Sequence, residues 1–186
     1  MAKNICKYFI ALVPVGALQE EVTAIKEDLK EKFGLKYALK SPAHVTLKMP
    51  FGWNEAKEDN LINSLEIFAR NHKSIKLSFQ GFGKFGNRVI YIKVKQSEQL
   101  GLMQSALAEF CKRELKLVKE LSDTNYHPHM TIAFKDMKVK FFEEYWNYTK
   151  GLDFNHSVKF DKFSLLKKID NRWISIKEIN LNSITN

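Results

Sequence analysis

A four-residue pattern pairing a histidine with a threonine occurs twice in the chain, 85 residues apart. The two copies are His44-Val45-Thr46-Leu47 and His129-Met130-Thr131-Ile132. In an extended strand, successive side chains point to opposite faces, so the histidine and threonine of each copy share one face. Each copy therefore predicts a strand with an apolar back for a core and a polar front that carries an imidazole and a hydroxyl.

Two such fronts facing each other across a cleft would form an acid–base site. An imidazole with its ordinary pKa of about 6.5 can donate or accept a proton near neutrality. One histidine as base and one as acid would each contribute roughly 10²–10⁴-fold in rate. The hydroxyls of Thr46 and Thr131 would donate to phosphate oxygens. A reaction that fits is opening of a cyclic phosphodiester: the base activates water and the acid protonates the departing ribose oxygen.

A metal site is the alternative use of these histidines. His127 and His129 flank Pro128, and with His44 they would supply three imidazoles, which is enough for a catalytic zinc ion. No acidic or cysteine ligand accompanies them, and the threonines would then have no function. We therefore expect no metal and no other cofactor.

The remaining pattern predicts strands that alternate with amphipathic helices. Apolar residues at three- and four-residue spacing mark each helix, and Gly81, Gly83 and Gly86 predict a turn-rich connection. The expected strands are 5–13, 43–50, 74–82, 89–94, 128–134, 157–166 and 172–181, and the expected helices are 18–33, 61–71, 100–110 and 141–148.

The order of these elements repeats along the chain. Residues 5–82 and 88–181 each read as strand, helix, histidine strand, helix, strand. We therefore predict one two-lobed domain over 1–186, with interleaved lobes and an α+β fold. Two βαβ-type halves related by a pseudo-twofold axis would form antiparallel-rich sheets around a central cleft, with the helices on the outer faces.

Composition restricts the possible partners and compartment. Thirty basic and twenty-one acidic residues leave a net charge of +9, which favours a phosphate-bearing partner, although a solvated lysine-rich surface explains the charge equally well. No apolar stretch approaches the ~20 residues that a membrane span needs. The two cysteines lie in no metal or redox spacing, as is typical of reduced thiols in the cytoplasm. We expect a cytoplasmic monomer that makes no membrane contact.

Four further residues are candidates for substrate binding. Tyr126, Phe51 and Phe85 lie near the motifs in sequence and could stack a base, as recognition of single-stranded RNA requires. Lys48 continues the alternation of His44 and Thr46, which would point its ammonium at a phosphate. The alternative is that the aromatic residues pack in the core or at its rim and that the lysine is solvated.

At the level of families, the paired motifs resemble the signature of the two-histidine phosphoesterase superfamily, in particular its 2′-5′ RNA ligase-like or RNA 2′,3′-cyclic phosphodiesterase branch. The resemblance extends to the opening strand at Tyr8–Leu12, the strand Val89–Val94 after a glycine-rich turn, and the closing hairpin from Ser164 to Ser175. It implies a bilobal α+β fold with both motifs in a central groove.

The resemblance also implies an activity and a set of partners. It implies hydrolysis of 2′,3′-cyclic phosphate ends of RNA, or of small cyclic nucleotides, and in some members reversible 2′-5′ joining. His129 would be the base and His44 the acid, or the reverse. Many relatives carry an arginine shortly after the second motif, where this chain has Phe134 and Lys135. A non-catalytic RNA- or nucleotide-binding module remains the alternative, although intact histidines and threonines in both motifs favour an enzyme.

Overall fold

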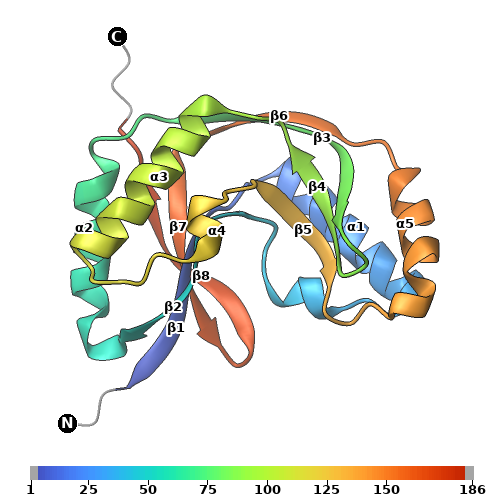
Figure 1. The fold of residues 1–186 in the computed structure, drawn as a ribbon, viewed down its shortest axis with the longest axis horizontal. Coiled ribbons are helices and arrows are strands. Elements are labelled where there is room, and N and C mark those ends of the chain that lie inside the picture. The colour runs from blue at the N-terminus through green and yellow to red at the C-terminus, as the bar shows by residue number, and fades with distance from the viewer. Residues whose placement is uncertain (1–3, 183–186) are drawn as a thin grey trace.

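The computed structural model describes residues 4–182, and its strands form two antiparallel four-stranded sheets (Figure 1). The first sheet has the order β2-β1-β7-β8, formed by β2 (Val45–Asn54), β1 (Ile5–Leu12), β7 (Lys162–Ile169) and β8 (Arg172–Asn180). The second has the order β5-β4-β3-β6, formed by β5 (His129–Phe134), β4 (Val89–Val94), β3 (Ile75–Phe85) and β6 (Asn155–Phe160).

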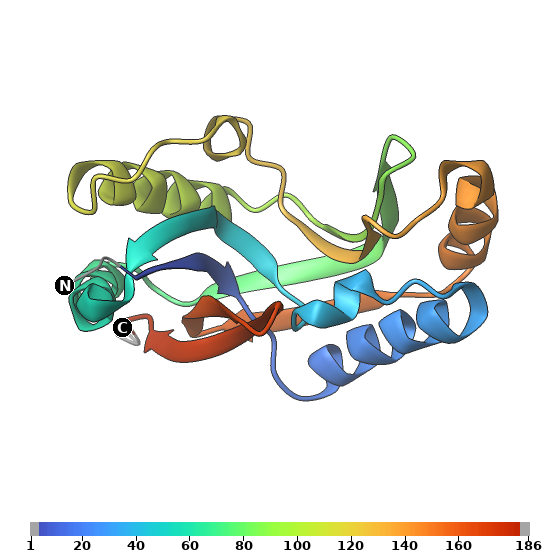
Figure 2. The same ribbon diagram turned by 90° about the horizontal axis from the view of Figure 1, so that it is seen from below.

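The longer helices lie at the two ends of the molecule, on the outer sides of the sheets (Figures 1 and 2). Helix α3 packs on β2 and α2 on β8, while α1 packs on β5 and α5 on β3. The helices are α1 (Ala17–Phe33), α2 (Glu58–Ala69), α3 (Glu98–Arg113), α4 (Leu121–Thr124) and α5 (Phe142–Lys150), with 3₁₀ turns η1 (Tyr37–Lys40), η2 (Glu55–Lys57) and η3 (Val139–Phe141). This arrangement confirms the predicted α+β class.

The two sheets are built alike, which confirms the pseudo-twofold duplication. In each sheet the histidine strand, β2 or β5, lies at an edge and pairs with the first strand of its own half, β1 or β4. The third strands are exchanged: β3 joins the sheet of β4, and β7 joins the sheet of β1. Each half of the sequence therefore contributes strands to both sheets.

The prediction of a single strand over 157–166 was wrong. The segment forms two strands, β6 and β7, which meet at Asp161 and belong to different sheets. Strand β6 pairs with β3, whereas β7 pairs with β1. The chain crosses between the sheets at this point, where the apolar alternation shifts phase, from Val158 and Phe160 to Phe163 and Leu165.

The glycine-rich stretch was also predicted incorrectly, since β3 continues through two of the glycines to Phe85. Gly81 has a φ of +61° and lies within a register shift of the β3–β4 pair. A Cβ atom on Gly83 would lie 2.6 Å from the ring of Tyr91. Glycine is thus required here for a bulge and for close ring contact, and only Gly86 lies in the turn.

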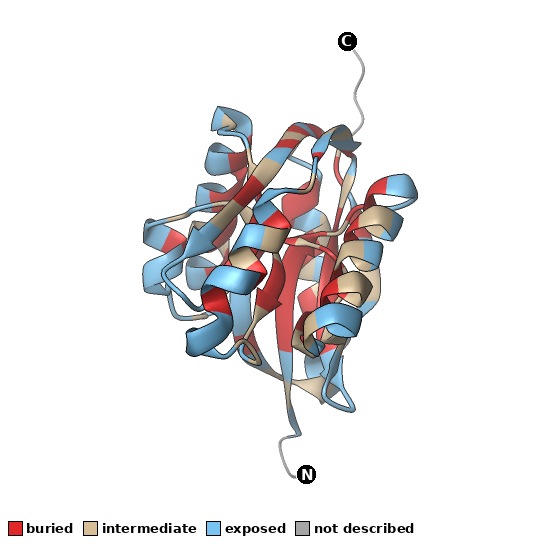
Figure 3. Ribbon diagram, turned by 90° about the vertical axis from the view of Figure 1, so that its right-hand side faces the viewer, coloured by how far each residue is buried: buried red, intermediate tan, exposed pale blue. Residues whose placement is uncertain are grey.

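The core is continuous between the two lobes, and buried residues line the inner faces of the elements (Figure 3). On β1, Tyr8, Ile10 and Leu12 belong to this main core. The opposite face of β1 carries Phe9 and Ala11, which form a small separate apolar cluster with Leu166 of β7. That second face is the one on which the first histidine lies.

Candidate active site

His44 immediately precedes β2, and a backbone carbonyl sets the orientation of its ring. Its Nδ1 lies 2.8 Å from the carbonyl oxygen of Pro42. A carbonyl only accepts, so Nδ1 carries the proton and Nε2 is the nitrogen with the free lone pair. The ring packs against Phe9, with the centroids 4.9 Å apart. Thr46 pairs with Ala11 of β1, which places it on the same face of the sheet as Phe9.

His129 begins β5 and is held in the same way. Its Nδ1 lies 2.7 Å from the carbonyl oxygen of His127, so Nε2 is again the acceptor nitrogen. The ring meets Phe85 edge-on, with the centroids 5.0 Å apart and an interplanar angle of 88°, and it contacts Tyr91 at 5.2 Å. Thr131 pairs with Tyr91 of β4, so it shares this face of the second sheet.

Burial keeps both imidazoles neutral at pH 7. The pKa of His44 is lowered to about 4, mainly by desolvation; the hydrogen bond to Pro42 raises it, and Lys26 and His129 add smaller lowering contributions. Desolvation likewise lowers the pKa of His129, with a smaller contribution from His127. Strands β2 and β5, which follow the two histidines, also contact each other across the interface of the sheets.

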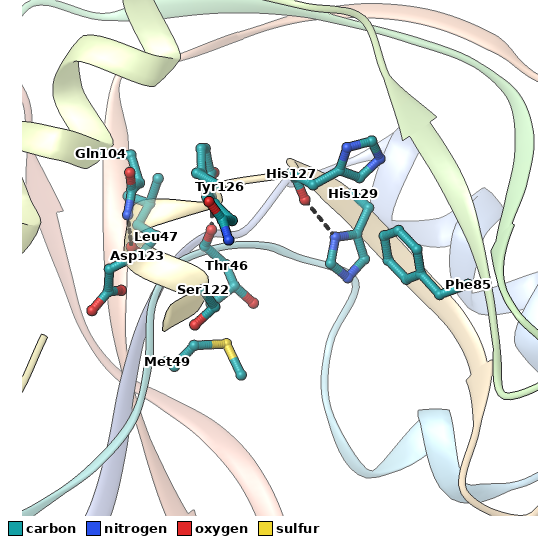
Figure 4. Close-up of a pocket in the computed structure, with 11 residues that line it drawn as sticks. Thr46, Leu47, Met49, Phe85, Gln104, Ser122, Asp123, Tyr126, His127 and His129 are labelled. Carbon is teal, nitrogen blue, oxygen red and sulfur yellow. Dashed lines mark hydrogen bonds between the residues drawn. The ribbon is translucent and has the colours of Figure 1, made fainter. Parts of the chain in front are cut away.

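A cavity of about 280 Å³ lies between the sheets, with residues of both motifs in its wall. Figure 4 shows His129 and Phe85 on one side, and Thr46 and Met49 of β2 on the other. The hydroxyl of Tyr126 donates to the carbonyl of Thr46 at 2.9 Å. This bond fastens the segment that leads into the second motif to the strand of the first.

Two of the four predicted substrate-binding residues line this cavity and a third does not. Tyr126 and Phe85 are in its wall together with Thr46 and His129. Phe51 is only 8% exposed and packs on Tyr8 in the main core. The prediction that Phe51 stacks a substrate base is corrected accordingly: its ring is occupied by the core.

Lys48 also differs from its predicted setting. The β1–β2 pairing shifts register between Ile10 and Ala11, so that Lys48 lies opposite Ile10 whereas Thr46 lies opposite Ala11. The resulting bulge turns Lys48 to the other face of the sheet. Its side chain is 2% exposed, forms an ion pair with Asp123, and donates to the carbonyl of Val118 at 2.9 Å. Lys48 therefore fastens α4 to β2, and its ammonium is not available to a phosphate.

Two features around the motifs were not predicted from the sequence. Lys26 lies on the apolar side of α1, between the buried Val22 and Leu29, and its place on that stripe could have revealed it. The turn after β5 is the other. Lys135, with a φ of 63°, donates to the hydroxyl of Tyr37 at 3.1 Å. No local pattern links those two residues, which are 98 positions apart.

The described residues 4–182 contain no group of three histidine, cysteine or acidic side chains placed to hold a metal ion. His127 lies instead beside Tyr91, with its Nε2 3.4 Å from the tyrosine hydroxyl. No helix in this part of the chain is long and apolar enough to cross a membrane.

Comparison with known proteins gives related folds over nearly the whole chain. A Thermus thermophilus protein superposes with a TM-score of 0.69 at 15% identity, over 96% of this chain and all of that one. Escherichia coli LigT superposes with a TM-score of 0.63 at 17% identity, over 97% of this chain and 99% of LigT. LigT has also been solved in complex with 3′-AMP, with NADP⁺ and with ATP.

Sequence comparison agrees with the structural one. A Bacillus licheniformis protein provisionally named a phosphoesterase is 27% identical over 167 residues, which cover 89% of this chain and 92% of that protein. A Bacillus pumilus protein of the same name is 26% identical over 167 residues, covering 89% and 91%. The sequence model of the 2′-5′ RNA ligase superfamily matches residues 14–172, which include both histidine motifs. The chain therefore belongs to the 2′-5′ RNA ligase superfamily.

Proposed function

We propose that the protein is a metal-independent phosphoesterase that opens 2′,3′-cyclic phosphate ends of RNA by two-histidine acid–base catalysis. The observation that carries the proposal is the matched orientation of the two imidazoles. In each, Nδ1–H is held by the carbonyl two residues earlier, at Pro42 or His127, which leaves Nε2 to exchange a proton with substrate. A group that only binds RNA has no need of two imidazoles held in one tautomer.

The reaction would use one histidine in each protonation state. Nε2 of His129 accepts a proton from water as the water oxygen bonds to phosphorus. The bond from phosphorus to one ribose oxygen breaks, and protonated His44 donates its proton to that oxygen. Thr46 and Thr131 donate hydrogen bonds to the non-bridging oxygens. Attack by a ribose hydroxyl in place of water would run the same steps toward 2′-5′ joining.

The negative charge of the substrate phosphate would favour the protonated form of His44 that an acid requires. Desolvation is the main reason that the pKa of His44 is about 4, so the imidazole is neutral near pH 7. A bound phosphate places a negative charge beside the ring and raises this pKa. Since His44 is the more strongly shifted of the two, the reverse assignment, with His44 as base, remains the second arrangement to test.

A nucleotide- or RNA-binding module is the second candidate. The complexes of LigT with 3′-AMP, ATP and NADP⁺ favour a site of this fold that accepts nucleotides in general. Tyr126 and Phe85 would then provide aromatic surfaces in the cavity for a base. This candidate differs from the first only in that nothing is turned over.

The decisive experiment incubates the purified protein, with EDTA present, with an RNA oligonucleotide that ends in a 2′,3′-cyclic phosphate. We expect opening to a phosphomonoester, and a loss of roughly 10²–10⁴-fold in the variants His44→Ala and His129→Ala. His72→Ala is the matched control, because His72 also bonds a backbone carbonyl, that of Phe68, but lies just after α2. Loss of wild-type activity in EDTA would contradict metal independence. Tight binding without turnover would establish the binding module.

We further propose that the protein acts as a cytoplasmic monomer. Both motifs belong to one chain, so a single copy carries the complete site. Cys6 and Cys111 are free thiols, which suits a reducing compartment. Light scattering should give a mass close to 21.7 kDa, and twice that mass would contradict the proposal.

A further inference from the structure

A second cavity, of about 310 Å³, lies behind the segment that carries His44. It is bounded by α1, by η1 and the Ser41–Pro42 segment, and by the start of β8, and it shares no lining residue with the cavity between the sheets. Figure 2 shows η1 between α1 and the β7–β8 hairpin. Three cations line the cavity, on three different elements: Lys26, Lys40 and Arg172.

Lys26 is the most unusual of the three, because it is a buried cation. Its side chain is 2% exposed, and its ammonium donates to the carbonyl of Ser41 at 3.2 Å. Desolvation lowers the pKa of Lys26 to about 8, so the group is still mostly charged at pH 7. A buried charge without a countercharge destabilises a protein, and an anion placed beside it removes that cost.

Lys40 and Arg172 are also held by uncharged partners. The ammonium of Lys40 lies 4.8 Å from the centroid of the Tyr37 ring. Arg172 donates through one nitrogen to the carbonyl of Leu39 at 2.9 Å, and a guanidinium has further N–H groups to offer. One acidic residue, Glu27, shares the wall, and its carboxylate is 2.6 Å from the ammonium of Lys30. The wall therefore has an excess of positive charge.

We propose that this cavity is a second anion site, which binds a phosphate group through Lys26, Lys40 and Arg172. Phosphate suits the donors: a guanidinium fork and two ammonium groups offer several N–H bonds to one tetrahedral anion. Ser41 also lines the cavity, and its hydroxyl offers one further donor, whereas the hydroxyl of Thr23 donates to the carbonyl of Gln19 at 2.7 Å. The phosphate is either the phosphodiester next to the reacting end of an RNA strand or a free anion.

The site is connected to His44 by direct contacts. Pro42 lines the cavity, and its carbonyl is the group that holds Nδ1 of His44. Trp173 lines it as well and meets Phe9 edge-on at 4.7 Å, while Phe9 contacts the His44 ring at 4.9 Å. The charge of Lys26 lowers the pKa of His44. A phosphate bound here would offset that charge and so raise the pKa of His44. Occupancy of the second site would thus favour protonated His44, and binding at the two sites is coupled.

The first test measures phosphate binding directly, without turnover. The chain has three tryptophans, and the double variant Trp53→Phe/Trp146→Phe leaves Trp173 in the cavity wall as the only fluorescent one. We expect saturable change of its fluorescence with inorganic phosphate, at least tenfold weaker after adding Lys26→Met or Arg172→Gln. Methionine keeps the length of Lys26 and removes the charge. Lys32→Met, an exposed change on the same helix, is the control.

Two outcomes would overturn the proposal. One is the absence of a saturable response, and the other is equal weakening by Lys32→Met and Lys26→Met, which would mean that only net charge matters. Circular dichroism shows whether each variant is folded, and Arg172→Gln, an exposed change, tests the site even if Lys26→Met does not fold. This arm does not depend on the proposed function.

The second test separates the two sources of phosphate and rests on the proposed function. We compare kcat/KM for a 2′,3′-cyclic mononucleotide and for a trinucleotide ending in the same group. If the strand phosphodiester occupies the site, Arg172→Gln should lower only the trinucleotide value, by about tenfold, and reduce the salt slope of its binding by about 1. If Arg172→Gln changes kcat/KM equally for both substrates, while the protein with Arg172 binds inorganic phosphate in the first test, the site binds a free anion. Absence of turnover would contradict the proposed function alone.

Discussion

His44 and His129 are held by the backbone in the same way but are surrounded by different side chains. Each histidine bonds the carbonyl two residues before it, and each stands at the start of an edge strand with a threonine two residues on. Beyond the backbone the two sites diverge. His44 packs on the buried ring of Phe9, with the charge of Lys26 nearby, whereas His129 packs on Phe85, which is 37% exposed.

The difference shows what a structural duplication preserves. The extended strand and the hydrogen bond to the carbonyl two residues earlier are repeated, because both depend on a few consecutive residues. The burial and charge around each ring are not repeated, because they come from side chains on other elements. A site that is nearly symmetric in geometry therefore becomes asymmetric in pKa, as acid–base catalysis by two identical groups requires.

The largest expected effect comes from removing both histidines together. If the two act as one unit, His44→Ala/His129→Ala should lose at most about tenfold more than the worse single variant, because catalytic groups that act together are strongly non-additive. Single-turnover rates on the cyclic RNA end measure this. If the loss in the double variant equals the product of the two single losses, the two rings contribute independently and do not act as one unit.

The next effect concerns the residue four positions after each histidine, which is Lys48 in one strand and Ala133 in the other. Lys48→Met leaves Asp123 buried without its partner and should cost about 3–5 kcal/mol of unfolding free energy. Lys48→Met/Asp123→Asn should recover most of this. Urea unfolding measures both. Lys162→Met, which breaks a partly exposed pair with Glu178, should change stability by no more than about 1 kcal/mol. A similar loss of unfolding free energy in Lys48→Met and Lys162→Met would show that the buried ion pair of Lys48 has no special structural role.

The dependence of stability on pH should distinguish His44 from other groups. Its pKa is about 4 in the folded protein and 6.5 unfolded, so the unfolded chain binds the proton first as pH falls. Stability from the neutral ring is full above pH 6.5 and is lost toward pH 4, a change on the order of 3 kcal/mol. In the variant His44→Gln, the unfolding free energy should change less with pH over this interval than in the wild type. Parallel curves for variant and wild type would show that the ring is not desolvated.

The smallest effect is expected at the exposed ring beside His129. Phe85→Ala removes an edge contact from a partly exposed side chain and should cost about 1 kcal/mol of stability, with a loss in kcat/KM below tenfold. Phe9→Ala, at the buried counterpart, should cost about 3–5 kcal/mol. Thermal unfolding and steady-state kinetics give both numbers. Equal destabilisation by the two changes would remove the contrast between the environments.

Period and spacing predicted much of the fold. The two motif strands, the four longer helices and the duplicated order all appear in the structure, since each depends on residues within one element. The errors arose where distant segments meet. Lys48 was assigned to the wrong face because a bulge against β1 reversed the alternation. Residues 157–166 were joined although the apolar alternation shifts phase at Asp161, because a bulge within one strand would produce the same shift.

The sequence by itself determined the chemistry that the chain brings: two histidines and two threonines, each pair on the polar face of a strand with an apolar back. These follow from residue type and a period of two, which are local properties. Only the tertiary structure decided the stronger desolvation of His44, the burial of Lys48, and the cluster of Lys26, Lys40 and Arg172 behind the first motif. Dielectric environment and charge proximity depend on which distant segments pack together, and no local pattern records that.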